Sequence, residues 1–186
     1  MMLSWIRCTL FKWIVLLTPL ALSGCASSDM NQYANEKPQL DLAQYFGGQT
    51  TGWGMVQDRF GNVTRRFVVQ IEGRFEGDQG ILDEKFEWSD GEKQQRIWRL
   101  KKVGSHQWSG QADDVIGQAT GDISGNVLRW RYTLAVPIKG TTLHMHFDDV
   151  MVLIDDQVML NRAVFSKWGI RLGEVSLSFR KPGQNP

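Results

Sequence analysis

From Thr50 onwards, apolar and polar residues alternate in short segments that turn-forming residues separate. A period of two is typical of half-buried β-strands, because successive side chains point to opposite faces of a sheet. We count about ten such segments before residue 181, at the spacing expected of hairpins. The turns are expected at residues 59–62, 77–80, 89–91, 103–105, 125–126, 139–140, 155–156 and 168–169. No segment after Phe46 has a helical period, so the pattern predicts an all-β fold.

A regular series of hairpins favours a single antiparallel up-and-down β-barrel or a strongly curved meander of about ten strands, because closure removes exposed sheet edges. Residues 45–181 would form this domain. A membrane-spanning barrel is disfavoured, since Asp83, Lys85 and Glu87 occupy alternate positions on a face that would contact lipid. Gly52-Trp53-Gly54 near the first strand is similar to the start of lipocalins, where a Trp plugs one end of the barrel.

The loop Ser89-Asp90-Gly91 predicts the register of the strands on either side of it. A three-residue loop with Gly at the left-handed position pairs Glu84 with Arg96 and turns Trp98 toward the inner face. Glu84 would then be buried directly opposite Arg96. A two-residue Asp90-Gly91 turn would instead shift the register by one and bring Ile97 inward.

Two further loops predict more of the barrel interior. The same reasoning at Asp155-Asp156 pairs Asp149 with Arg162, a second internal acid–arginine pair. At Gly125-Asn126 it sets Trp130 against Gly121, Tyr132 against Ala119 and Leu134 against Gly117. Large rings would lie over small residues, which is how a narrow barrel is filled.

The position of Asp113 is ambiguous. Counting from the strand that follows places Asp113 inside, whereas counting from the strand that precedes places Asp114 inside. A β-bulge at this pair would reconcile the two.

The predicted internal charges have two interpretations. Acid–arginine pairs can satisfy one another and specify the register. Alternatively, the arginines bind an anionic head group, such as a fatty-acid carboxylate or a phosphate, while aromatic side chains line space for an apolar chain, by analogy with lipocalin-like barrels. The candidate ligand-binding residues are Glu84, Arg96, Trp98, Asp113, Tyr132, Asp149 and Arg162.

His144-x-His146-x-Asp148 is the one spacing typical of a metal site, because alternate strand residues share a face and could converge on Zn²⁺. The predicted register turns this face outward, which favours ordinary exposed polar residues. The sequence contains no Gly-x-Ser-x-Gly motif and no phosphate-binding loop. We therefore expect a protein that is not an enzyme and has no cofactor.

The N-terminus has the features of an export signal. Residues 1–12 carry Arg7 and Lys12 and no acid, and residues 13–22 form an uncharged, mostly apolar run too short to span a bilayer. Leu22-Ser23-Gly24-Cys25 then resembles the lipobox of bacterial lipoproteins. The resemblance implies a signal peptide over residues 1–24, a diacylglycerol on the Cys25 thiol and acylation of its new amine. An ordinary secreted protein with a chance cysteine is the alternative.

The anchor changes how the rest of the chain is interpreted. Residues 25–44 would be a lipidated tether, and Ala26 in place of an Asp implies the outer membrane by resemblance to Gram-negative lipoproteins. Removing 24 of 186 residues leaves 162, enough for one domain. With Cys8 removed and Cys25 alkylated, no disulfide is expected. The remaining 19 basic and 20 acidic side chains contain no basic block, so nucleic acid is not an expected partner.

Several phrases together resemble an uncharacterised family of Gram-negative lipoproteins, a domain of unknown function. They are Gln57-Asp58-Arg59-Phe60-Gly61, Glu84-Lys85-Phe86-Glu87-Trp88-Ser89-Asp90-Gly91-Glu92, Arg96-Ile97-Trp98, Ala112-Asp113-Asp114-Val115-Ile116-Gly117, Phe147-Asp148-Asp149-Val150-Met151, Asn161-Arg162 and Lys167-Trp168-Gly169. The resemblance covers residues 47–181 and implies a lipoprotein that faces the periplasm, without an activity.

Three functions remain open. The first is binding or carriage of a lipid, a fatty acid or another apolar ligand at the outer membrane. The second is a structural or envelope-assembly role, with a filled core and a protein partner. The third is a metal-dependent enzyme that uses His144, His146 and Asp148. Residues 182–186 are expected to be a disordered tail.

Overall fold

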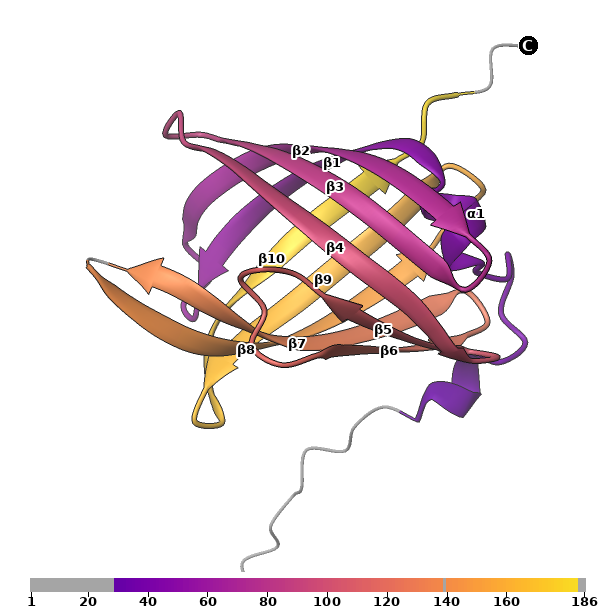
Figure 1. Ribbon diagram of the computed structural model, residues 1–186. Helices are drawn as coiled ribbons and strands as arrows, with labels where there is room; N and C mark the ends of the chain where they lie inside the picture. The colour runs from indigo at the N-terminus through magenta and orange to yellow at the C-terminus, as the bar shows by residue number, and fades with distance from the viewer. Residues whose placement is uncertain (1–28, 139, 184–186) are drawn as a thin grey trace, which may run out of the picture.

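A computed structural model describes residues 29–138 and 140–183. It contains a closed barrel of ten antiparallel strands, as the hairpin pattern predicts (Figure 1). Each strand pairs with its neighbours in the sequence, and β1 pairs with β10 to close the sheet. The strands are β1 (Gly48–Asp58), β2 (Val63–Glu76), β3 (Gln79–Trp88), β4 (Lys93–Gly104), β5 (Gln107–Gln111), β6 (Ala119–Ser124), β7 (Val127–Ile138), β8 (Thr141–Leu153), β9 (Val158–Lys167) and β10 (Ile170–Arg180).

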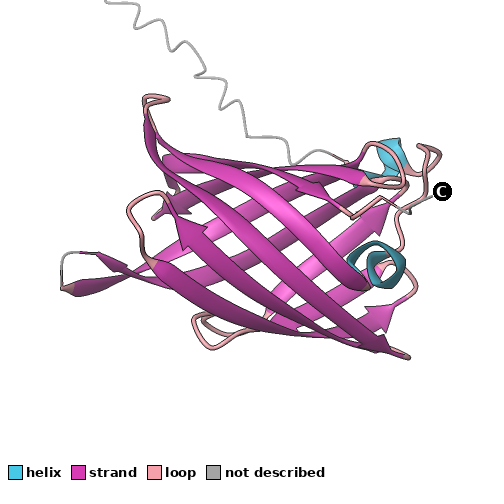
Figure 2. Cartoon of the chain, turned by 90° about the horizontal axis from the view of Figure 1, so that it is seen from above, coloured by secondary structure: helices cyan, strands magenta, loops and turns pink. Residues whose placement is uncertain are grey.

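The N-terminal segment closes one end of the barrel, which we call the closed end (Figure 2). Asp41 caps the N-terminus of helix α1 (Leu42–Phe46), and its carboxylate accepts a hydrogen bond from the Gln44 amide at 2.8 Å. Phe46 is buried against Phe179 of β10 in an edge-to-face contact, with the ring centroids 5.6 Å apart. The backbone amide of Leu40 donates to Gly125 O at 2.8 Å. The segment predicted to be a tether therefore lies, in its last residues, against the barrel.

The short 3₁₀ helix η1 (Met30–Tyr33) also contacts the barrel, next to β6. All ten strands and the buried core lie within residues 29–183, so a chain that begins at Ala26 keeps the whole barrel. Among the described residues, no helix is long and apolar enough to cross a membrane.

The turn at Ser89-Asp90-Gly91 confirms the predicted register of β3 and β4. Gly91 has a φ of 87°, and the Trp88 amide donates to Glu92 O at 2.9 Å. Glu84 consequently pairs with Arg96, as expected of a three-residue loop with Gly at the left-handed position.

Small residues on the inner face make room for rings. Trp130 pairs with Gly121, as predicted, and a Cβ on Gly121 would lie 2.3 Å from the indole. A Cβ on Gly54 would likewise lie 2.3 Å from the Phe67 ring. Because Gly52 and Gly54 take inward positions, alternation turns Trp53 outward, and Trp53 is 50% exposed. The prediction that Trp53 plugs the barrel is wrong.

The β8–β9 register differs from the prediction by one residue. The Asp155 carboxylate accepts hydrogen bonds from the Gln157 and Val158 amides, and the Ile154 amide donates to Val158 O. This side-chain capping closes a three-residue loop, one residue longer than the two-residue turn predicted at Asp155-Asp156. Asp149 therefore pairs with Ala163 and not with Arg162. A shift of one residue exchanges the two faces of β9.

Candidate functional site

The barrel encloses a cavity of about 500 Å³, a volume within the usual range for small-molecule sites. The cavity extends from Leu42 and Phe46 at the closed end to Trp88 and Ile138 at the opposite end. There the lining side chains are partly exposed, and we call this the open end. Figure 1 shows α1 at the closed end and the tip of the β3–β4 hairpin at the open end.

Aromatic rings make up much of the cavity wall. Tyr132 and Phe147 stack with their ring centroids 5.2 Å apart, and Trp98 contacts Tyr132 edge-on at 5.5 Å. On the other side, Phe67 packs against Phe86 at 5.6 Å. Trp98 and Tyr132 thus face inward, as the register predicts. The wall is mostly aromatic and aliphatic, which favours contact with an apolar molecule.

The first polar cluster in the wall joins three side chains from different parts of the chain. Arg96 donates from Nε and Nη2 to the Asp114 carboxylate, with a shortest distance of 2.7 Å from Nη2 to Oδ2. Its Nη1 lies 3.8 Å from Glu84 Oε2, and the side chains of Arg96 and Glu84 are each 14% exposed. Arg96 therefore already contacts two carboxylates. Its two-pronged hydrogen bond, from Nε and Nη2, is to Asp114.

Glu84 is the less well compensated acid of this cluster. Burial raises the pKa of Glu84 to about 7, although the Arg96 charge acts in the opposite direction. The charged form is disfavoured because water is excluded and the nearest guanidinium is shared with Asp114. Glu84 can thus hold or release a proton near neutral pH.

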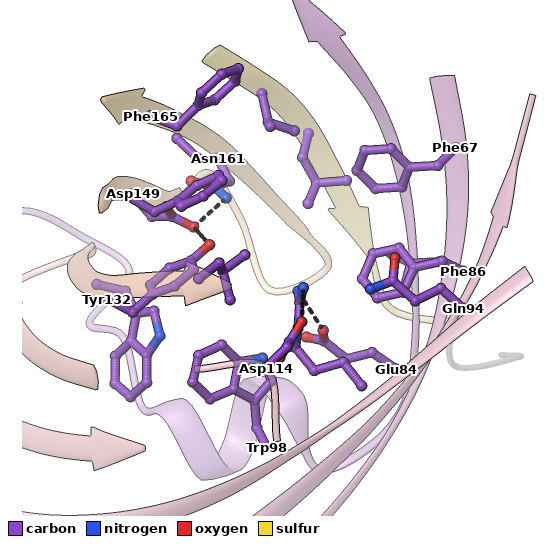
Figure 3. A pocket seen from close by; sticks show the side chains of 18 of the residues that line it. Phe67, Glu84, Phe86, Gln94, Trp98, Asp114, Tyr132, Asp149, Asn161 and Phe165 are labelled. Atoms are coloured by element: carbon purple, nitrogen blue, oxygen red, sulfur yellow. Dashed lines mark hydrogen bonds and ion pairs between the residues drawn. The ribbon is translucent and has the colours of Figure 1, made fainter. Parts of the chain in front are cut away.

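The second polar cluster lies across the cavity, on β7, β8 and β9 (Figure 3). Oδ2 of Asp149 accepts a hydrogen bond from Asn161 Nδ2 at 3.2 Å and a longer one from the Tyr132 hydroxyl at 3.4 Å. Burial raises the pKa of Asp149 to about 7, against the effect of these two donors. Asp149 and Asn161 are buried, and each keeps one oxygen without a partner.

Two of the candidate residues lie outside the cavity. Asp113 is exposed and pairs with Arg99 at 3.2 Å, whereas the neighbouring Asp114 points inward to Arg96. The structure has a turn here and not the predicted bulge, because β5 ends at Gln111 and the Val115 amide donates back to Ala112 O. For the same reason Val115, and not Gly117, lies opposite Leu134.

Arg162 is the second candidate outside the cavity. On the outer face of β9, its Nε donates to Glu174 Oε2 at 2.8 Å. The predicted Asp149–Arg162 pair is therefore wrong, and the inward neighbour is Asn161. The signal that could have found Asn161 is Asp155, because an acid that caps the amides two and three residues further on favours the longer, three-residue loop.

His144 and His146 are exposed on the outer face of β8, as the register predicts. Asp148 shares that face and is held by Arg129, whose Nε donates to it at 2.7 Å. Within residues 29–138 and 140–183, no three His, Cys, Asp or Glu side chains are grouped to hold a metal ion. Cys25 lies outside the described residues.

Residues 19–181 match the family described as Protein of unknown function (DUF3833). The chain belongs to this family. The match covers the whole barrel and agrees with the resemblance noted in the sequence. A search of curated proteins finds no match to this DUF3833 member.

Solved structures were also compared with this DUF3833 chain, and the first of the following two shares its fold. The S-type phycobiliprotein lyase CPES from Guillardia theta is 7% identical, with a TM-score of 0.56, and the likeness covers 78% of this chain and 95% of the lyase. A de novo designed fluorescence-activating β-barrel is 12% identical with a TM-score of 0.43, covering 77% of this chain and 99% of the design. At these identities the likeness concerns the barrel alone.

Proposed function

We propose that this protein binds an apolar or amphiphilic molecule inside its barrel and acts as a lipid-anchored carrier or receptor in the periplasm, not as an enzyme. The observation that carries the proposal is the cavity of about 500 Å³ with an aromatic and aliphatic wall. A core serving stability alone would be filled by side chains, because empty apolar space costs stability. An unfilled interior of this size disfavours the purely structural alternative.

The polar groups in the wall support binding over catalysis. Within the described part of the chain, no His, Cys, Ser or Thr lines the cavity. The cavity wall has a small number of polar side chains, and they are grouped in two clusters, as in sites that orient a ligand. Because α1 covers the closed end, such a ligand would enter at the open end, between the β3–β4 turn and the region where β7 ends and β8 begins.

The sequence supports the anchored part of the proposal. Cys25 precedes Asp29 by four residues, and an extended chain covers roughly 3.3–3.6 Å per residue. Since η1 lies beside the barrel near the closed end, a diacylglycerol on Cys25 would hold that end close to the bilayer. The open end would then face away from the outer membrane, toward the periplasm.

Cavity blocking tests the binding proposal. The chain from Ala26 onwards, stripped of bound lipid, is titrated with a neutral apolar dye such as Nile red. Ala163→Phe places a ring in the cavity, because Ala163 is buried in its wall, and should abolish saturable binding. Val164→Phe on the outer face of the same strand is the matched control and should bind like the native chain. Equal binding by both variants would contradict the proposal.

A further inference from the structure

Two buried oxygens in the cavity wall have no hydrogen-bond partner. They are Oδ1 of Asp149 and Oδ1 of Asn161, on side chains whose residues are 4% and 7% exposed. The two residues belong to the adjacent strands β8 and β9, and both line the cavity (Figure 3). Buried acceptors normally have a donor, because leaving one without a partner is costly.

The neighbouring donors are already in use. Asn161 must present Nδ2 to the Asp149 carboxylate, and this leaves its oxygen as an acceptor. The Tyr132 hydroxyl donates to the same carboxylate oxygen that Asn161 contacts. Both protein donors therefore converge on Oδ2, and no donor of the described residues reaches the other two oxygens, whose residues line the cavity.

The charges of the cavity also disfavour an anion. Four carboxyl side chains and two guanidinium groups line it, an excess of two negative charges when Glu84 and Asp149 are ionised, and no Lys or His is among the lining residues described. Arg96 faces Asp114 and Glu84, and Arg65 at the open end pairs with Asp90 and Glu92. An entering carboxylate would find both arginines paired and would meet like charges.

We infer that the ligand's polar end carries hydrogen-bond donors, as an alcohol or an alkylammonium does, and that Asp149 and Asn161 accept from it. This inference rests on the proposed function, because it names the chemistry of the molecule that the same cavity would take. It replaces the anionic head group suggested by the sequence, since Arg162 lies outside and Arg96 is already paired. A hydroxyl or ammonium would supply the donors that the free oxygens lack.

A matched head-group series tests this inference. The lipid-free chain from Ala26 onwards is titrated calorimetrically with dodecan-1-ol, dodecylammonium, dodecanoate and dodecyl methyl ether. The alcohol and the ammonium should bind at least tenfold more tightly than the carboxylate and the ether, which lack a donor. Asp149→Asn should reduce the preference for the ammonium over the alcohol. Asp148→Asn, the same change on the outward-facing neighbour, should leave the order unchanged.

The outcomes separate the inference from the function on which it rests. Dodecanoate binding as tightly as the alcohol overturns the inference and leaves a binding barrel. The ether matching the alcohol overturns it as well, because the free oxygens would then not select the ligand. An unchanged preference in Asp149→Asn removes Asp149 from the site. The series on the unmodified chain decides the head-group chemistry even if Asp149→Asn fails to fold. If no amphiphile or neutral dye binds, the proposed function itself fails.

Discussion

Replacing Glu84 with Gln should stabilise the protein above neutral pH. Arg96 Nη1 lies 3.8 Å from Glu84 Oε2, which corresponds to an attraction of about 4 kcal/mol at an effective dielectric constant of about 20. Burial still raises the pKa of Glu84 to about 7 from its ordinary value of 4.5. The charge therefore costs about 3 kcal/mol in the folded state, because each pKa unit corresponds to about 1.4 kcal/mol.

The sign of the pH dependence follows from the direction of this shift. An acid whose pKa is raised on folding binds more protons in the folded state, so its contribution to stability is complete below about pH 4.5. The contribution is lost as the pH rises through about 7. Glu84→Gln should therefore change the free energy of unfolding little at pH 5 and raise it by about 3 kcal/mol at pH 8.

Removing the arginine should have the opposite effect. Arg96→Met leaves the Asp114 and Glu84 carboxylates without their cation, which should cost about 3–5 kcal/mol at pH 8. The cost should be smaller at pH 5, where Glu84 takes up a proton. Asp83→Asn, one residue away on the outer face, is the control and should cost less than about 1 kcal/mol.

Urea unfolding of the chain from Ala26 onwards, followed by tryptophan fluorescence at pH 5 and pH 8, measures all three variants. The reasoning is refuted if Glu84→Gln lowers the free energy of unfolding at pH 8 as much as Arg96→Met does. In that case the Glu84 charge would be stabilising, and its burial would be fully compensated by Arg96.

Three further predictions concern other parts of the chain. Phe46→Ala should lower the free energy of unfolding by about 3–5 kcal/mol in the same urea assay, because the ring is buried at the closed end. Arg162→Met should cost about 0–1 kcal/mol and leave Nile red affinity unchanged, since it breaks only the surface pair with Glu174; a large loss of affinity would place Arg162 at the ligand. Cys25→Ser should abolish acylation and leave unprocessed precursor in fractionated cells, and a mature, acylated mutant would refute the lipobox interpretation.

The sequence predicts the barrel well because strand alternation and turn residues are local signals. Gly91 adopts a left-handed conformation that favours glycine, so the loop length could be predicted, and with it the burial of Glu84 opposite Arg96. Gly121 likewise marks where Trp130 needs space. These features depend on residues that are close in sequence, and their positions follow from the pleat.

The polar site was less predictable because it depends on loops whose length side chains decide. Asp155 caps two amides and favours a β8–β9 loop one residue longer than predicted, and that extra residue exchanges Arg162 for Asn161 inside the barrel. Asp114 reaches Arg96 only because the chain leaves the ladder after Gln111. Counting residues along either strand cannot show this departure. The anionic head group was inferred from Arg162, which the predicted register placed on the inner face and the structure places on the outer face.

The most direct test of a ligand-binding barrel is to locate the bound molecule by NMR of methyl groups. Dodecan-1-ol is titrated into the chain from Ala26 onwards with labelled Leu, Ile and Met methyls. The account predicts saturable shifts, at one molecule per chain, in the cavity-lining methyls of Leu82, Met145 and Met151. Shifts confined to the exposed side chains of Ile81 and Leu160 would contradict it, because the molecule would then be adsorbed on the outer surface of a barrel that binds nothing inside.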